Sequence, residues 1–317
     1  MANKVFITKV CVLFSVFCLS FAGEDLCPPP EAVSPCECKN PEDPYIHCKK
    51  IREVDTIANM VERTGGMKFR YLLLENSSLL YLPTKALITD QFEGLMVTNT
   101  TLGALFDKPP SSHNSIKTII LLDVTLQRSL QFEKFLKVTK LENLTLLHTT
   151  VKFLGKDFKE CISPSLTTLY MAWTKTSGIT DGAFENLKSL EHLYITRNHI
   201  RKVKRSMFPS PASLKTIDWQ SNAIEELPDD IFSDMPNLKF VVLRDNKITL
   251  LAEPTFGSIL SHLSSLNVDK NPISCNCTFN WIVSRDHSKI IGTCHDPDFQ
   301  EGKRIKELTD KDFNHCS

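Results

Sequence analysis

The feature that most constrains this 317-residue chain is an internal repeat of about 24 residues. Each unit has apolar residues at its first, fourth, sixth and eleventh positions and, in the clearest copies, asparagine at the ninth, as in Leu214-x-x-Ile217-x-Trp219-x-x-Asn222-x-Ile224. Clear copies begin at residues 190, 214, 238 and 263, and weaker copies begin at residues 69, 92, 116, 141 and 166. One such unit cannot bury its own apolar face, so the units are expected to stack as coils of a solenoid.

The ninth position predicts how each coil bends. A buried asparagine amide can satisfy backbone groups at a tight turn, and these side chains are expected to form a ladder: Asn198, Asn222, Asn246 and Asn271. In the first five units the position holds Ser77, Thr100, Val124, Thr149 and Thr174. Because the Val124 side chain has no polar atom, we expect a water or a distorted bend there.

The other side of each coil repeats as well. Phenylalanines recur before successive coils and predict a continuous stack on the convex side: Phe158, Phe184, Phe208, Phe232 and Phe256. Cys161 takes a position that later coils fill with leucine, methionine or isoleucine, so we expect a free, buried thiol. An intermolecular disulfide or a reactive thiol is the alternative.

The first 23 residues resemble a secretory signal peptide. Lys4 and Lys9 precede an apolar run through Phe21, and cleavage is expected after Ala22 or Gly23. No later stretch has the roughly 18 to 20 apolar residues of a membrane span, and the polar C-terminal residues predict no lipid anchor. The 37 basic and 37 acidic side chains give no electrostatic reason to expect nucleic acid or an anionic membrane as a partner. We therefore expect a secreted, extracellular protein.

Nine cysteines lie outside this segment, four near the start, four near the end and Cys161 between them. In an oxidising compartment this distribution favours two terminal disulfide clusters. Zinc is the alternative for the second cluster, since His287, His295 and His315 lie among its cysteines.

The segment from Asn271 to Trp281, with Cys294 and Cys316 after it, resembles the C-terminal cap of extracellular leucine-rich-repeat proteins. The segment from Cys27 to Cys48 resembles their N-terminal cap, with a longer gap between the first two cysteines than is usual. The resemblance implies these disulfides: Cys275–Cys294, Cys277–Cys316, Cys27–Cys38 and Cys36–Cys48. Phe279 and Trp281 would lie on the exposed last coil.

The fold implied is an α/β-type solenoid, a leucine-rich-repeat horseshoe with a curved parallel sheet of about nine or ten strands on its concave face. Its expected parts are a signal peptide (1–23), an N-terminal cysteine cap (24–68), eight repeats (69–262), and the last repeat strand with the C-terminal cap (263–317). The wider family includes guidance molecules, matrix proteoglycans and Toll-type ectodomains. The layout is also similar to arthropod proteins related to the non-catalytic subunit of a shrimp (Oplophorus) luciferase, which implies a stabilising subunit of a secreted enzyme as the alternative function.

The concave sheet is the expected binding face. Its outward positions carry an apolar run of Ile120, Leu122, Leu147, Tyr170 and Tyr194, with His192 and Arg197 as polar edges. Exposed apolar surface of this kind often marks an interaction site, so we expect an extracellular protein or glycan to bind here. Scattered exposed apolar residues on strands are the alternative.

Two further groups of residues are candidates for modification or binding. Asn76, Asn99 and Asn143 begin glycosylation sequons, and Asn276 begins a fourth whose middle residue is a cysteine. A basic cluster lies around Val203: Arg197, Arg201, Lys202, Lys204 and Arg205. It is expected to be a solvated loop, with a sulfated-glycan site or a processing site as alternatives.

Motifs of catalysis are missing from the sequence: there is no nucleophile elbow, paired-carboxylate motif, metal-binding helix or phosphate loop. His192 is the one titratable group considered, and the sequence suggests no partner for it. We expect a binding protein that is not an enzyme and needs no cofactor or metal.

Overall fold

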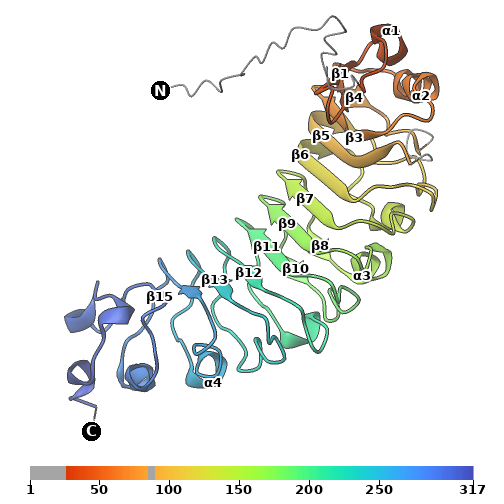
Figure 1. Ribbon diagram of the computed structural model, residues 1–317. Helices are drawn as coiled ribbons and strands as arrows, with labels where there is room; N and C mark the ends of the chain where they lie inside the picture. Colours follow the sequence, from red (N-terminus) through yellow and green to blue (C-terminus); the bar gives the residue numbers. More distant parts are fainter. Residues whose placement is uncertain (1–25, 85–89, 317) are drawn as a thin grey trace, which may run out of the picture.

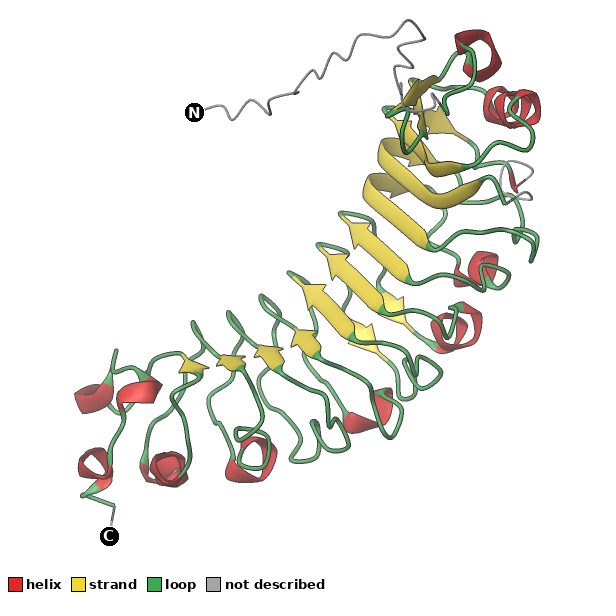
Figure 2. Ribbon diagram, in the orientation of Figure 1, coloured by secondary structure: helices red, strands yellow, loops and turns green. Residues whose placement is uncertain are grey.

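The computed structural model describes residues 26–84 and 90–316. The predicted signal peptide, residues 1–23, lies outside these ranges. The described chain forms a curved array of coils with the strands along the concave side and the short helices along the convex side (Figures 1 and 2). No helix in the described part of the chain is both long enough and apolar enough to cross a membrane.

One 13-stranded sheet runs through the whole array. The strands of the repeats are β3 (Phe69–Glu75), β5 (Phe92–Leu102), β6 (Thr118–Leu126), β7 (Asn143–Leu147), β9 (Thr168–Ala172), β11 (His192–Thr196), β12 (Thr216–Asp218), β13 (Phe240–Val242) and β14 (Ser265–Asn267). Each pairs in parallel with the next. The sheet exceeds the nine or ten strands predicted because the caps add β1 (Glu37–Lys39), β2 (Tyr45–Lys49) and β15 (Ile290–Ile291), and β4 (Ser78–Leu79) pairs with β5.

The register of the strands places equivalent repeat positions side by side. Leu193 pairs with Ile217, and Ile217 pairs with Val241, so fourth-position residues face one another from coil to coil. These side chains are fully buried. Alternation along each strand therefore sends one set of side chains into the core and the third, fifth and seventh positions to the concave surface.

The convex side carries short helices and small secondary strands. They are η2 (Phe132–Phe135), α3 (Lys156–Cys161), η3 (Arg205–Met207), α4 (Glu253–Phe256), β8 (Phe153–Leu154) and β10 (Gly178–Ile179). Beneath them the predicted phenylalanines are buried, with ring centroids 6.0 Å apart for Phe158 and Phe184 and 5.3 Å apart for Phe184 and Phe208. The predicted stack is not continuous, because the ring of Phe208 contacts Trp219 and Phe232 pairs with Phe256. Phe132 extends the stack toward the N-terminus, 5.0 Å from Phe158.

Asparagine amides hold the bends of the later coils. The Asn246 Oδ1 atom accepts from the backbone N–H of Ile224 at 3.0 Å, and its Nδ2 donates to the carbonyls of Trp219 and Leu243, both at 2.9 Å. Asn198, Asn222 and Asn271 make equivalent bonds to their own coil and the one before it. The amides thus join consecutive coils through backbone groups that would otherwise be buried without partners.

The early coils bend in another way. Strands β5 and β6 continue past the ninth position, so Thr100 pairs with Val124 and Leu102 pairs with Leu126. Backbone hydrogen bonds also join these coils beyond the bend, such as the one from the Thr101 N–H to the Ser77 carbonyl at 3.0 Å. Val124 is buried within this paired strand. Strand pairing therefore replaces the side-chain amide at Val124, and the predicted distorted bend is not needed there, while the predicted water stays a prediction.

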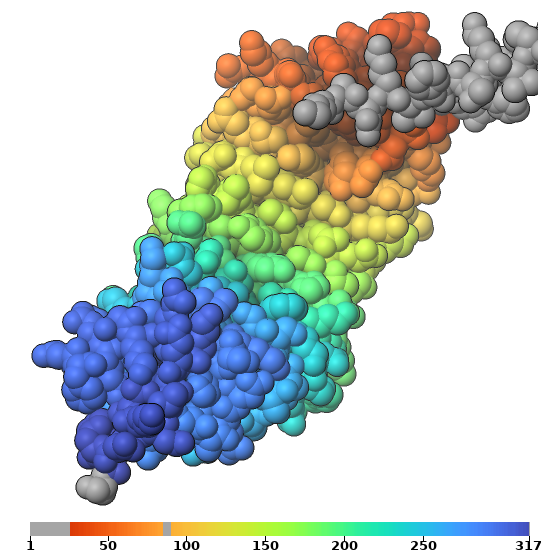
Figure 3. All heavy atoms as spheres, turned by 60° about the vertical axis from the view of Figure 1, so that its left-hand side comes forward, coloured from red at the N-terminus to blue at the C-terminus, as the bar shows by residue number. Residues whose placement is uncertain are grey.

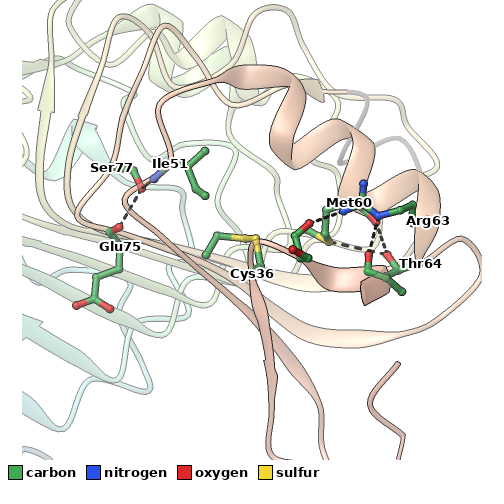
Figure 4. The surroundings of a disulfide bond; sticks show 10 residues. Cys36, Ile51, Met60, Arg63, Thr64, Glu75 and Ser77 are labelled. Carbon is green, nitrogen blue, oxygen red and sulfur yellow. Dashed lines mark hydrogen bonds between the residues drawn. A yellow bond between two sulfur atoms is a disulfide. The ribbon is translucent and has the colours of Figure 1, made fainter. Parts of the chain in front are cut away.

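The N-terminal cap covers the first coil with α1 (Pro30–Val33), the antiparallel pair β1–β2 and α2 (Val54–Arg63). Disulfides join Cys27 to Cys38 and Cys36 to Cys48, as the resemblance implied. Figure 4 shows Cys36 beneath α2, near Ser77. The Ser77 hydroxyl accepts from the Ile51 N–H and donates to the Glu75 carbonyl, both at 2.9 Å, which ties the cap to the first repeat.

The C-terminal cap consists of β15 and four 3₁₀ helices: η4 (Cys277–Ser284), η5 (Asp298–Gln300), η6 (Ile305–Glu307) and η7 (Asp310–Phe313). Disulfides join Cys275 to Cys294 and Cys277 to Cys316, again as implied. Phe279 and Trp281 are buried at this end, and the Trp281 Nε1 donates to the Leu251 carbonyl at 3.1 Å. Figure 3 shows the cap, in dark blue, packed directly onto the last coils.

Candidate functional site

The predicted binding residues lie in two rows across the concave sheet. In the fifth-position row, Ile120 pairs with Thr145, Thr145 with Tyr170, and Tyr170 with Tyr194. In the seventh-position row, Leu122 pairs with Leu147. All five predicted apolar residues are half-buried on this face. Since neighbouring strands lie roughly 4.8 Å apart, they can form one continuous surface, which we call the concave apolar face.

The two tyrosines form the centre of this face. Their ring centroids are 5.7 Å apart with an interplanar angle of 44°. His192 stacks beside Tyr194, with centroids 6.3 Å apart and planes at 13°. The aromatic groups thus form a broad surface with two hydroxyls, a combination that suits protein interfaces.

His192 has polar partners that the sequence did not suggest. Its Nδ1 lies 3.2 Å from the Thr216 hydroxyl, and its Nε2 lies 3.9 Å from the carboxylate of Glu191. The carboxylate of Glu191 is in turn 2.7 Å from the ammonium group of Lys215. These contacts fix the imidazole at the border of the face.

A half-buried carboxyl group lies beside Tyr194 on the next strand. Asp218 pairs with Tyr194 across the strands, and its Oδ1 accepts from the Gln220 N–H at 2.9 Å. Burial raises the pKa of Asp218, and the backbone hydrogen bond opposes part of that effect. A carboxyl group therefore borders the face on its C-terminal side.

Arg197 lies beyond the end of its strand, at the eighth repeat position. Its guanidinium carbon is 4.6 Å from the ring centroid of Trp173, and the ring of His148 lies 4.8 Å from Trp173 on the preceding coil. Sequence reasoning missed Trp173 and His148 because, apart from Arg197, it considered the eighth position only for its asparagines. Comparing the eighth position of every coil would have identified His148, Trp173 and Arg197 as neighbours.

The sequons occupy different surfaces. Asn76 and Asn99 are exposed at eighth positions of neighbouring coils, with the Asn99 Nδ2 donating to the Asn76 Oδ1 at 2.5 Å. Asn143 is half-buried at a third position of the concave sheet, paired with Thr118 and Thr168. The Asn276 side chain accepts from the Thr278 N–H at the start of η4. Occupancy of the sequons stays a prediction.

The cysteine predictions need one correction. Cys161 is free, but it is half-buried and packs against the edge of the core at the end of α3, where a fully buried thiol was predicted. Burial and the nearby carboxylates of Asp157, Glu133 and Glu160 raise the pKa of its thiol. Cys277, Cys316 and His315 are close enough to suggest a metal site, but the two sulfurs are bonded to each other. Disulfide formation therefore occupies the atoms that zinc would need.

The basic cluster is partly engaged in the fold. The Arg205 Nε donates to the Ser233 carbonyl at 2.7 Å, and the Lys204 ammonium lies 3.1 Å from the Asp181 carboxylate. Arg201 and Lys202 are exposed. This arrangement fits the expected solvated loop better than a dedicated binding site.

Comparison with known proteins agrees with this architecture. The family model described as "Leucine rich repeat" matches residues 164–224 and 212–273. A solved chain in the "Octameric complex of Latrophilin 3 (Lec, Olf), Unc5D (Ig, Ig2, TSP1) and FLRT2 (LRR)" superposes with a TM-score of 0.58 and 16% identity, covering 84% of this chain and 88% of that one. At this identity the likeness shows the fold alone.

Curated relatives match parts of the chain. The rat leucine-rich repeat and fibronectin type-III domain-containing protein 4 is 28% identical over 143 residues, which are 43% of this chain and 22% of that protein. Human epiphycan is 42% identical over 66 residues, or 21% and 20% of the two chains. Rabbit lumican is 29% identical over 140 residues, or 44% and 70%. The chain thus spans about a fifth of the first two relatives, and none of the three supports the luciferase-subunit resemblance, which stays a prediction.

Proposed function

Because this chain is a leucine-rich-repeat protein with disulfide-bonded caps at both ends, we propose that it is a secreted binding protein that docks an extracellular protein on its concave apolar face. The observation that carries the proposal is the row of Ile120, Thr145, Tyr170 and Tyr194 on four consecutive strands. The partner covers the coils between residues 116 and 213. Tyr170 and Tyr194 are its anchors.

The physical argument rests on exposed aromatic area held rigidly. Strand pairing fixes both tyrosine backbones, so little conformational entropy is lost when a partner covers the rings. Buried tyrosines are common hot spots of protein interfaces because they combine apolar area with a hydroxyl. His192 and Arg197 provide polar groups at the border, as a rim around an apolar centre requires.

The test uses the partner that co-purifies with the native protein. Replacing both Tyr170 and Tyr194 by Ala should weaken its binding by roughly 2 kcal/mol or more, which is about thirtyfold in Kd, while folding and secretion stay intact. Biolayer interferometry against the purified partner measures the loss. The matched control is Phe153→Ala, since Phe153 is an exposed aromatic on β8, outside the main sheet.

Unchanged affinity in the double tyrosine variant would contradict the proposal, most clearly if substitutions at Arg201 and Lys202 abolished binding instead. A glycan on Asn143, whose side chain lies on the same sheet, would also count against a protein partner centred there. A secreted oxidase or luciferase that co-purified in equal amount and bound elsewhere on the solenoid would favour the stabilising-subunit alternative.

A further inference from the structure

The eighth positions of the coils form a row along the edge where the strands end. Asp123, His148, Trp173 and Arg197 occupy this row on four consecutive coils. The Asp123 carboxylate is 2.6 Å from the His148 Nδ1, His148 packs at 61° against Trp173, and Arg197 lies over the Trp173 ring. Each side chain thus positions the next.

All four residues of this row are exposed and have left-handed φ values between 50° and 54°, and Trp173 is the bulkiest of them. Its φ is 52°, a left-handed value that is costly for a bulky side chain, and the residue is 43% exposed. Asparagine occupies the same position at Asn76 and Asn99, where it suits the left-handed turn.

A groove of about 580 Å³ opens beside the indole. It lies where the two kinds of bend meet, because β6 continues to Leu126 while the following coils turn earlier. The lining combines apolar, hydroxyl and cationic side chains: Val124, Thr125, Leu126, His148, Thr150, Trp173, Lys175, Arg197 and His199.

The cations of the groove are free to bind a ligand. Within residues 26–84 and 90–316, no carboxylate lies within 4.0 Å of the charged nitrogens of Lys175 or Arg197. Asp123 is hydrogen-bonded to His148. The face of the guanidinium rests on the indole, so its N–H groups at the rim stay available to a carboxylate or sulfate.

We propose that this groove binds a short anionic oligosaccharide, recognised through its sulfate or carboxylate groups. Lys175 and Arg197 bind the negative charge, the exposed part of Trp173 contacts the C–H surface of a sugar ring, and Thr125 and Thr150 bond its hydroxyls. The volume suits a ligand of a few rings, whereas a folded protein partner would need a contact of about 800 Å². The site lies at the strand ends and shares only Arg197 with the border of the concave apolar face.

The experiment measures binding of a heparin-derived tetrasaccharide by isothermal titration calorimetry. The double substitution Lys175→Gln with Arg197→Gln should weaken binding at least tenfold. The matched control, Arg201→Gln with Lys202→Gln, removes the same charge from the convex loop and should stay within twofold of wild type. Equal losses in both variants would mean non-specific charge attraction and would overturn the proposal, as would a loss in the control alone.

A third variant separates ligand contact from a structural role. Trp173→Asn relieves the left-handed strain, so its melting temperature should equal or exceed that of wild type while its affinity falls at least fivefold. Unchanged affinity would show that the Trp173 indole does not contact the ligand. The double variant Tyr170→Ala with Tyr194→Ala should keep full tetrasaccharide binding whether or not the concave apolar face binds a protein.

Two further ligands test the chemical class. Neutral chitotetraose should bind at least tenfold more weakly than the sulfated tetrasaccharide, because it lacks the anionic groups. A hexaglutamate peptide should also bind more weakly, because it offers no sugar ring to the indole. Tighter binding of the peptide would assign the groove to an acidic protein segment and overturn the carbohydrate assignment.

Discussion

Asp218 shows how a single side chain couples the concave face to pH. Burial raises its folded-state pKa, so between the unfolded and folded pKa values the folded protein binds more protons than the unfolded chain. Stability contributed by this group is therefore complete below the unfolded pKa and is lost as the pH rises through the folded pKa. A neutral side chain of the same shape avoids that loss.

We expect Asp218→Asn to raise the free energy of unfolding at pH 7 and to have no such effect near pH 3. The asparagine oxygen can still accept the Gln220 N–H, so the difference isolates the charge. The gain should exceed the ~0.5 kcal/mol scatter of ordinary surface substitutions in urea titrations. Asp230→Asn, at an exposed position, is the control and should show no gain. Equal gains at both pH values would rule out the proposed charge effect.

Cys161 should react slowly with iodoacetamide in the native protein. Half exposure gives the reagent access, but a raised pKa leaves little thiolate at pH 7. The labelling rate, followed by mass spectrometry, should therefore rise from pH 7 to pH 9 more steeply than that of a free cysteine peptide. Fast labelling at pH 7, or a dimer that disappears in Cys161→Ser, would contradict this expectation.

Single residues were predictable where a repeat position has one dominant role. Asn198, Asn222, Asn246 and Asn271 all lie where the pattern put them because the buried bend demands an amide. The sequence of the coil that contains Trp173 does not show that this residue belongs to a site. Its importance arises from His148 and Arg197, which stacking brings close from about 25 residues away on either side.

Within each coil, the backbone groups at the bend need hydrogen-bond partners. Asparagine amides provide them in the later coils, and pairing between β5 and β6 provides them in the early ones. Asn246→Ala removes the acceptor for the Ile224 N–H and the donor to two buried carbonyls. The Ile224 N–H is left without an acceptor, whereas the Trp219 and Leu243 carbonyls still accept from Asn222 and Asn271. One orphaned group costs about 1–3 kcal/mol, so the free energy of unfolding should fall by about that amount. Urea unfolding followed by circular dichroism measures the change, and a loss below 1 kcal/mol would show that the ladder contributes little.

In the early coils we expect an asparagine at the ninth position to destabilise the protein. Val124→Asn restores the repeat consensus, yet we expect it to destabilise the protein by about 1–3 kcal/mol. The backbone groups around Val124 already pair with the Thr100 strand, so a buried amide there would lack partners. A stabilising effect in the same urea assay would mean that strand pairing does not replace the ladder.

The strands of all nine repeats start at or within a few residues of the predicted units, because alternation and spacing mark them directly. The sequence did not predict that β5 and β6 run on past the bend. Thr100 and Val124 favour strand conformation, but whether a strand continues depends on its neighbour doing the same. Strands β2, β4 and β15 were missed for the same reason, since each forms by pairing with a repeat strand, and β1 forms by pairing with β2.

Across the whole molecule, each cap has one sheltered and one accessible disulfide. Cys48 and Cys275 are fully buried, whereas Cys277 is exposed and Cys27 half-buried. Brief treatment of native protein with dithiothreitol should open Cys27–Cys38 and Cys277–Cys316 first, and leave Cys36–Cys48 and Cys275–Cys294 closed until the chain unfolds. Alkylation followed by peptide mapping gives the order. Simultaneous opening of all four would mean that the caps unfold as the reagent enters.

The concave apolar face and the groove beside Trp173 depend on different features of the solenoid. The concave apolar face could be predicted because strand alternation alone decides which side chains point outward. The groove beside Trp173 could not, because it depends on where the bends change from one kind to the other.

The change from strand-paired bends to asparagine bends also limits where further coils can be inserted. A coil copied from residues 214–237 and inserted before residue 238 would meet an asparagine bend on both sides, and each new amide would find the carbonyls it needs. The same coil placed between β5 and β6 would interrupt their continuous pairing and leave strand edges without partners. We therefore expect a duplicated coil to fold when it is inserted on the C-terminal side of the groove beside Trp173. A coil inserted between β5 and β6 should destabilise the protein.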